Sequence, residues 1–234
     1  MIQLQKTIGD YVADNIKTAH VFKKYGIDFC CGGGITLEHA CEKHGLDINI
    51  VREELSNVEL NRDRSFKFNN WQPGFLIDYI VNEHHSYVRE SLPIISEYAS
   101  KVARVHGQNY PEVVQVNEII TEVVKELSAH LQKEEQILFP YIKELESADN
   151  DKRMPHQAPF GHVNNPITMM EKEHESAGDA FKAIAELTNN YTPPMGACFT
   201  FRALYSKLQE FEEDLHQHIH LENNILHKKA LQLQ

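Results

Sequence analysis

Four long segments of this 234-residue chain repeat apolar residues at intervals of three and four, the spacing of one face of a helix. Alternating patterns typical of strands are scarce. The four segments cover residues 74–107, 112–146, 165–188 and 197–231, with a possible bend at Pro93 in the first. Turn-forming stretches separate them, so successive helices should run antiparallel. The pattern therefore predicts an all-α protein built around an up-down-up-down four-helix bundle.

The first 57 residues have a different pattern, which predicts a small N-terminal helical domain. Its short helices should begin at capping residues such as Thr7 and Thr36 and end at glycines such as Gly45. Residues 58–72 are polar and irregular and end before Pro73, which is typical of a linker. We therefore expect an N-terminal domain at 1–57, a linker at 58–72 and the bundle at 73–234.

Composition narrows the classes of partner. The net charge is −11 and no basic run is present, which argues against nucleic acid and anionic membranes as partners. No window approaches 18 consecutive apolar residues, and the first residues lack the apolar core of a signal peptide. Four cysteines, two of them adjacent, do not resemble a secreted disulfide framework, so the expected location is the cytoplasm.

Histidine and glutamate pairs stand out in two of the long segments. His130 and Glu134 are four residues apart in the second, and His218 and Glu222 are four apart in the fourth. This spacing brings an imidazole and a carboxylate to the same helix face. Chance alone gives about as many such pairs in a chain this rich in histidine and glutamate. Whether they form a site must therefore be judged from their positions along the helices.

Position does distinguish one histidine in each segment. Residues of antiparallel neighbours lie at the same height when the midpoint of their numbers falls in the connecting turn. This holds for each neighbouring pair among His85, His130, His174 and His218. Four imidazoles and two carboxylates in a bundle core are suitable ligands for two iron ions, with positions left for water, dioxygen or nitric oxide. The competing interpretation is a set of solvent-facing histidines on charged helices.

Other histidines fit the layer less well. The apolar stripe of the first segment points closer to His84 than to His85, so periodicity alone favours His84 as the inward residue. His106 lies about 31 Å farther along a continuous helix than His85, too far to reach the same centre. His216, His220 and His227 flank the fourth-segment pair and are expected beside the site or at the surface.

A pair of adjacent cysteines, Cys30 and Cys31, precedes three glycines and the helix that Thr36 should begin. Adjacent cysteines are poor partners for an ordinary disulfide. Backbone N–H groups and a helix N-terminus can stabilise thiolates, which suggests reactive or metal-binding thiols. Two small buried cysteines beside a glycine turn are the alternative.

Together, the motifs "FCCGGG", "TLEHAC", "EHHSYVRESLP", "SAHLQKEEQILFPYIK", "EKEHESAG" and "HIHLENNILH" resemble the Repair of Iron Centres (ScdA-type) family over nearly the whole chain. This resemblance implies an ScdA-type N-terminal domain followed by a hemerythrin-like di-iron bundle. It implies two non-haem iron ions per chain, with an oxo or hydroxo bridge. The implied ligands are His85, His130, Glu134, His174, His218 and Glu222, and here the motif favours His85 over His84.

The resemblance also implies a function, the repair of iron–sulfur clusters damaged by oxidative or nitrosative stress. The protein would supply iron, reduce nitric oxide, or do both, with Cys30 and Cys31 taking part in the chemistry. The implied partners are damaged iron–sulfur proteins, nitric oxide or dioxygen, and a second copy of the chain in a homodimer. A nitric-oxide reductase and an oxygen or nitric-oxide sensor are the alternatives, so the sequence leaves open whether the protein is an enzyme.

Overall fold

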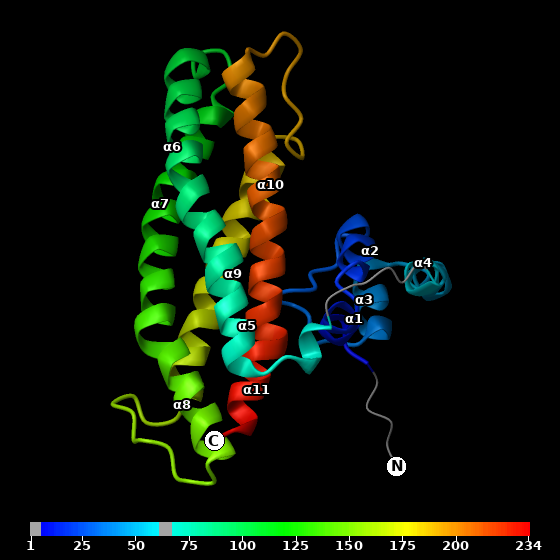
Figure 1. Ribbon diagram of the computed structural model, residues 1–234. Helices are drawn as coiled ribbons and strands as arrows, with labels where there is room; N and C mark the ends of the chain where they lie inside the picture. Colours follow the sequence, from blue (N-terminus) through cyan, green and yellow to red (C-terminus); the bar gives the residue numbers. More distant parts are fainter. Residues whose placement is uncertain (1–5, 61–66) are drawn as a thin grey trace.

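The computed structural model describes residues 6–60 and 67–234, and it confirms the predicted all-α fold. Four helical columns stand side by side and form an antiparallel bundle (Figure 1). The first column packs against the second and the fourth, and the second packs against the third. In chain order, the columns consist of α5 (Pro73–Tyr79), η2 (Ile80–His85) and α6 (Ser86–His106); α7 (Glu112–Lys133), η3 (Glu134–Leu138) and α8 (Phe139–Asn150); α9 (Asn164–Leu187); and α10 (Phe199–Leu221), η4 (Glu222–Leu226) and α11 (His227–Gln232).

Short helices make up the N-terminal domain. They are α1 (Ile8–Asp14), α2 (Thr18–Lys24), α3 (Leu37–His44) and α4 (Ile48–Leu60). The predicted caps are present: Thr7 forms a capping box with Asp10, Thr36 accepts a hydrogen bond from the His39 backbone, and Gly45 ends α3 with φ of 64°. These local interactions satisfy backbone groups that a helix end leaves unpaired.

The segment between the two parts is more structured than a simple linker. Helix α4 extends to Leu60, and a 3₁₀ turn, η1, covers Phe68–Asn70. Phe68 is buried, and its ring packs against those of Trp71 and Tyr79. The middle of the predicted linker, residues 61–66, lies outside the described residues.

Two apolar clusters fill the bundle, and the predicted histidine and glutamate layer lies between them. One cluster includes Leu131 and Ile219, and the other includes Leu138 and Leu221. The first cluster also takes in side chains of the N-terminal domain, such as Phe22, so the two parts share a core. Polar groups in this layer are therefore enclosed by apolar side chains and depend on one another for partners.

The N-terminal domain packs against the C-terminal column of the bundle, beside α10 and α11 (Figure 1). Lys23 pairs with Glu212 of α10 at 3.2 Å, and Asn224 of η4 donates a hydrogen bond to the Cys30 carbonyl at 3.0 Å. The cysteine pair thus lies at the junction of the two parts. None of the described helices is long and apolar enough to cross a membrane.

Candidate metal centre

Six side chains from the four columns converge in the layer between the apolar clusters, and all six are buried. They are the predicted residues His85, His130, Glu134, His174, His218 and Glu222. Their ligand atoms form two groups, and within each group all atoms lie within 4.8 Å of one another. One group contains His85 and His218, the other contains His130 and His174, and the two glutamates belong to both. The geometry therefore forms two adjacent groups of ligand atoms that share both carboxylates, and each group could hold a cation.

π-Helical turns place three of these side chains. His85 ends η2, Glu134 begins η3 and Glu222 begins η4. A π turn inserts an extra residue into a helix and rotates the residues on either side of it, and such turns are frequent at functional sites. The turn at η2 explains why the apolar stripe favoured His84, since a 3.6-residue period no longer applies across it.

His84 is also buried, but it occupies a different place from His85. Its Nδ1 atom donates to Asp214 at 2.9 Å, and its ring stacks on that of His218 with centroids 5.4 Å apart. The Nε2 atom of His85 lies 3.4 Å from Glu134 and 3.7 Å from Glu222. The structure thus brings His85 into the carboxylate layer and sets His84 behind His218.

Three separate hydrogen bonds fix the orientation of three of the rings. In each case the ring donates from its Nδ1 atom. His85 donates to Glu135 at 2.6 Å, His130 donates to Glu173 at 2.8 Å, and His174 donates to Asn223 at 2.8 Å. Each bond fixes the hydrogen on Nδ1 and leaves the Nε2 lone pair facing the layer. Partners of this kind hold metal-binding histidines in the required tautomer.

These partner residues were not predicted from the sequence. Glu135, Glu173 and Asn223 are polar residues next to predicted ones, whereas Asp214, which holds His84, lies four residues before His218. All four lie on helices rich in charge. The one available signal was adjacency, since Glu135 follows Glu134, Glu173 precedes His174, and Asn223 follows Glu222. Adjacency alone cannot tell which neighbour turns toward the layer.

Unpartnered atoms test whether a metal fits the layer. His85 Nε2, both carboxylate oxygens of Glu134 and Glu222 Oε2 are buried with no hydrogen bond partner among the described residues. The Nε2 atoms of His130 and His174 lie 3.0 Å apart, and His218 Nε2 lies 3.0 Å from Glu222. Two donors at right angles, each about 2.1 Å from one ion, are about 3.0 Å apart. The donor set therefore fits metal ions.

The pKa values of the layer also favour a bound cation. Burial opposes protonation of His85 and His130, yet the two glutamates raise the pKa of His85 to about 10 and that of His130 to about 9. Burial likewise opposes ionisation of Glu134, but the histidines outweigh it and lower its pKa to about 2. The pKa of Glu222 is also held well below its ordinary value, despite its burial, by His218, His174 and His85. Without metal, His85 and His130 therefore carry protons beside the two carboxylates, whereas burial lowers the pKa of His218.

The remaining histidines lie apart from the two groups. His106 is at the far end of α6, where its Nε2 atom lies 3.3 Å from Cys198 Sγ. His227 stacks on His174 and bonds to Glu171, and His220 accepts a hydrogen bond from Asn224. Both His220 and His227 are buried, whereas the sequence left open whether they face the surface.

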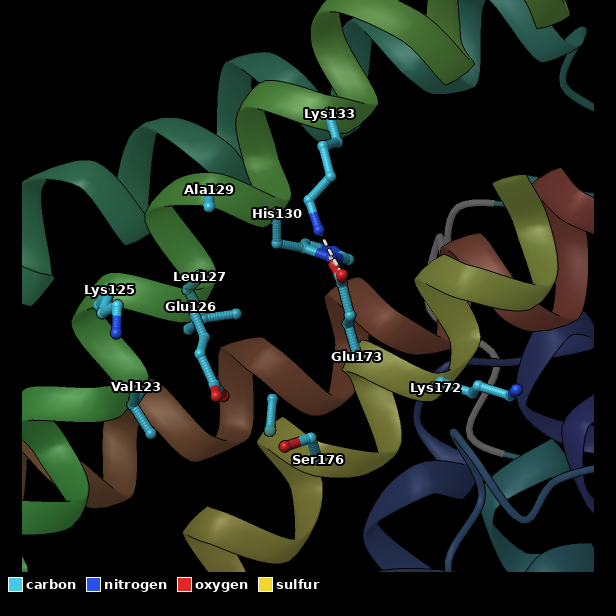
Figure 2. Close-up of a pocket in the computed structure, with 11 residues that line it drawn as sticks. Val123, Lys125, Glu126, Leu127, Ala129, His130, Lys133, Lys172, Glu173 and Ser176 are labelled. Atoms are coloured by element: carbon cyan, nitrogen blue, oxygen red, sulfur yellow. Dashed lines mark hydrogen bonds and ion pairs between the residues drawn. The ribbon is translucent and has the colours of Figure 1, made fainter. Parts of the chain in front are cut away.

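A groove between α7 and α9, with a volume of about 330 Å³, is lined by His130 (Figure 2). Val123, Leu127 and Ala177 give it apolar walls. Figure 2 shows Lys133 and Glu173 meeting beside His130, and both line the groove. The groove gives a small ligand a place next to the layer.

The cysteine pair sits in a turn that a single carboxylate organises. Asp28 accepts hydrogen bonds from the backbone N–H groups of Cys30 at 2.9 Å, Cys31 at 3.0 Å and Gly32 at 2.9 Å. A Cβ atom on Gly33 would lie 2.3 Å from the Phe29 carbonyl, so the tight turn requires glycine. Cys30 is buried and Cys31 is half-buried, and both are free thiols.

This geometry corrects the expectation that backbone N–H groups stabilise a thiolate at Cys30. Asp28 takes those N–H groups, and the Cys30 thiol donates to the same carboxylate at 3.2 Å. The neighbouring Cys31, burial and the charge of Asp28 all raise the pKa of Cys30 well above its ordinary value. Without a cation, Cys30 is therefore a protonated thiol.

Comparison with known proteins is consistent with this two-part organisation. Residues 4–59 match ScdA_N, a domain of unknown function (DUF542), and residues 76–230 match the hemerythrin HHE cation binding domain. The chain is 38% identical over 215 residues to the "probable iron-sulfur cluster repair protein" of Haemophilus influenzae, covering 90% of each chain. It is 39% identical over 211 residues to the "iron-sulfur cluster repair protein YtfE" of Yersinia pseudotuberculosis, again covering 90% of each. The Yersinia pestis protein of the same name is 38% identical over 215 residues, which cover 92% of this chain and 91% of that protein.

Proposed function

Since this chain, with its ScdA_N and hemerythrin HHE domains, belongs to the family of iron–sulfur cluster repair proteins, we propose that it restores damaged clusters with iron held in the histidine and glutamate layer of its bundle. The observation that carries the proposal is the pair of four-residue groups that share Glu134 and Glu222. The relatives' names favour repair over the nitric-oxide reductase and the sensor considered from the sequence.

In this proposal, six residues hold two iron ions. His85 and His218 hold one, His130 and His174 hold the other, and the two shared glutamates contact both. The mixed nitrogen and oxygen donors suit iron. Bound iron would supply both a cargo for cluster rebuilding and a redox-active site for nitric oxide or dioxygen.

The surrounding residues set how firmly the layer holds a cation. Glu135, Glu173 and Asn223 accept the Nδ1 hydrogens and so keep the Nε2 lone pairs aimed inward. Glu173 is partly exposed, and its side chain also lines the groove in Figure 2 and binds Lys133. A rotation of Glu173 toward solvent would free His130 to turn, which offers a route for release of an ion.

The cysteine pair is proposed to act on the client cluster. Cys30 and Cys31 lie on the junction between the two parts, and Cys31 is accessible enough to meet a partner protein. Sulfur ligands match the sulfide and thiolate surroundings of iron in a cluster. The expected clients are iron–sulfur proteins damaged by oxidants or nitric oxide.

Recovery of a damaged client tests the function. An iron–sulfur enzyme inactivated with nitric oxide would be incubated anaerobically with the iron-loaded protein and a reductant, and its activity followed. We expect recovery with the wild type and none with a Glu134→Gln, Glu222→Gln variant. Glu118→Gln is the matched control, because Glu118 is an exposed carboxylate on the same column. Equal recovery with both variants would contradict the proposal.

A further inference from the structure

A second cluster of metal-binding side chains lies outside the bundle, in the cysteine turn. The ligand atoms of Asp28, Cys30 and Cys31 all lie within 4.8 Å of one another. The two sulfur atoms are 3.9 Å apart, and Cys30 Sγ is 3.2 Å from Asp28 Oδ1. This separation is too long for a disulfide, whose bond is about 2.05 Å.

The distances are close to those of a tetrahedral site. Two sulfur atoms about 2.3 Å from one tetrahedral ion lie about 3.8 Å apart, and a sulfur and an oxygen lie about 3.5 Å apart. The turn therefore already holds its two sulfur atoms at the separation that a bound ion requires, and the distance from Cys30 Sγ to Asp28 Oδ1 is within a few tenths of an ångström of the tetrahedral value.

We propose that Asp28, Cys30 and Cys31 form a three-ligand site for a thiophilic divalent cation such as Fe(II), Zn(II) or Co(II). Binding exchanges two thiol protons for one M²⁺ ion, and both protons go to solvent, so no oxidant or reductant is needed. Binding itself rests on the geometry of the turn, and its use in handing iron to a client cluster rests on the function proposed above.

Charge in the turn supports a cation. Asp28 binds three backbone N–H groups, and no lysine or arginine among the described residues forms an ion pair with it. Its Oδ1 atom accepts from Cys30 and Cys31, but its Oδ2 atom has a single hydrogen bond, from Gly32, so the carboxylate keeps a lone pair for a cation on Oδ2. Asp28 is exposed and Cys31 half-buried, so an ion can enter from solvent.

The bundle holds the turn in this geometry. Asn224 Nδ2 donates to the carbonyls of Phe29 at 3.3 Å and Cys30 at 3.0 Å. On the neighbouring helix, a Cβ atom at Gly178 would lie 4.0 Å from Cys31 Sγ. A three-ligand site on a held turn keeps one coordination position open, as catalytic zinc sites do, whereas structural zinc sites fill all four.

The test is an anaerobic titration of the metal-free, full-length protein with Co(II), because thiolate ligands give Co(II) an intense near-ultraviolet charge-transfer band that the bundle's nitrogen and oxygen donors cannot give. We expect the band in the wild type, a weaker band in each of Cys30→Ser and Cys31→Ser, and none in the double variant. Cys41→Ser and Cys198→Ser are matched controls that should keep it. A band that survives the double variant, or no band in the wild type, would overturn the proposal.

Asp28→Asn tests the third ligand. Loss of its charge should weaken Co(II) binding by about 10- to 100-fold, as expected for a charge-assisted interaction. Asp47→Asn is the control, since Asp47 also accepts a backbone N–H in this domain but lies outside the turn. Circular dichroism checks that each variant is folded, and a folded Asp28→Asn variant with wild-type affinity would remove Asp28 from the site.

Measuring the iron bound by the bundle distinguishes a failure of the site in the turn from a failure of the proposed repair function. The double cysteine variant should keep wild-type iron in the bundle. If no thiolate band forms while the bundle loads iron and repairs a client, the site in the turn is refuted and the proposed function stands. If the band forms but the bundle binds no metal, the proposed function fails and the site stands.

Discussion

His130 and His174 face each other from two neighbouring columns with their Nε2 atoms 3.0 Å apart, and each donates its Nδ1 hydrogen to an oxygen on the other side of its ring. In the neutral rings, two lone pairs therefore meet in a buried layer. Such contact is unfavourable unless a proton or a metal ion lies between the nitrogens. This relationship gives a reason to expect that the layer binds cations strongly.

Metal removal should destabilise the protein. A ligand that binds only the folded state at 100 times its dissociation constant adds about 2.7 kcal/mol to the free energy of unfolding. For a chain of this size, that raises Tm by roughly 5–10 °C. Thermal unfolding followed by circular dichroism, with and without Fe(II) under anaerobic conditions, measures the shift. The same shift in a Glu134→Gln, Glu222→Gln variant would place the binding elsewhere.

The two adjacent histidines of η2 should differ in their effects on metal binding. His85→Ala removes a nitrogen that faces Glu134 and Glu222, so it should lower the iron content. His84→Ala removes a ring that stacks on His218 and binds Asp214, so it should keep the iron and weaken its affinity by about 10-fold. Iron analysis after gel filtration compares them. Lower iron content in His84→Ala than in His85→Ala would contradict the assignment.

His84 and His85 also show which features of the site could not be predicted from the sequence. Helical periodicity predicted the four columns, because apolar stripes of many residues average over local irregularity. It failed at His84 and His85, because a π turn changes the residue spacing over a few positions and no residue type specifies such a turn. The histidine layer was predicted from the midpoints between residue numbers of neighbouring segments. That prediction requires only that the helices be antiparallel.

The partner residues could not be predicted for a related reason. Glu173 is one of many acidic residues on an exposed helix face, and its bond to His130 depends on how α7 and α9 pack. Asp28 was missed as well, although it lies two residues before Cys30. Its role depends on the path of the turn, which brings three backbone N–H groups around one carboxylate.

Glu173→Gln should weaken metal binding without removing it. The amide can still accept the Nδ1 hydrogen of His130, but it lacks the negative charge that strengthens the bond. Substitution of such outer partners typically lowers metal affinity by about 10- to 100-fold. Competition with a chelator of known affinity measures the change. Glu175→Gln, an exposed neighbour on α9, should leave the affinity unchanged, and equal effects in both variants would contradict the role of Glu173.

Adjacent asparagines of η4 should have separable effects. Asn224→Ala removes the donor to the Phe29 and Cys30 carbonyls, so the cysteine turn should loosen and Cys30 should be alkylated faster. Asn223→Ala removes the acceptor for His174, so it should lower metal affinity and leave alkylation unchanged. Mass spectrometry after a timed pulse of iodoacetamide measures the first effect, and chelator competition measures the second. Reversal of the two patterns would refute this division of roles.

Iron stoichiometry tests the central claim most directly. The protein would be prepared anaerobically with excess Fe(II), freed of unbound metal, and analysed for iron per chain beside Glu134→Gln, Glu222→Gln and the exposed control Glu118→Gln. Because both glutamates belong to both four-residue groups, we expect two iron ions per chain in the wild type and in the control, and loss of iron in the two ligand variants. Less than one iron per wild-type chain, or two irons retained in both ligand variants, would contradict a two-iron layer.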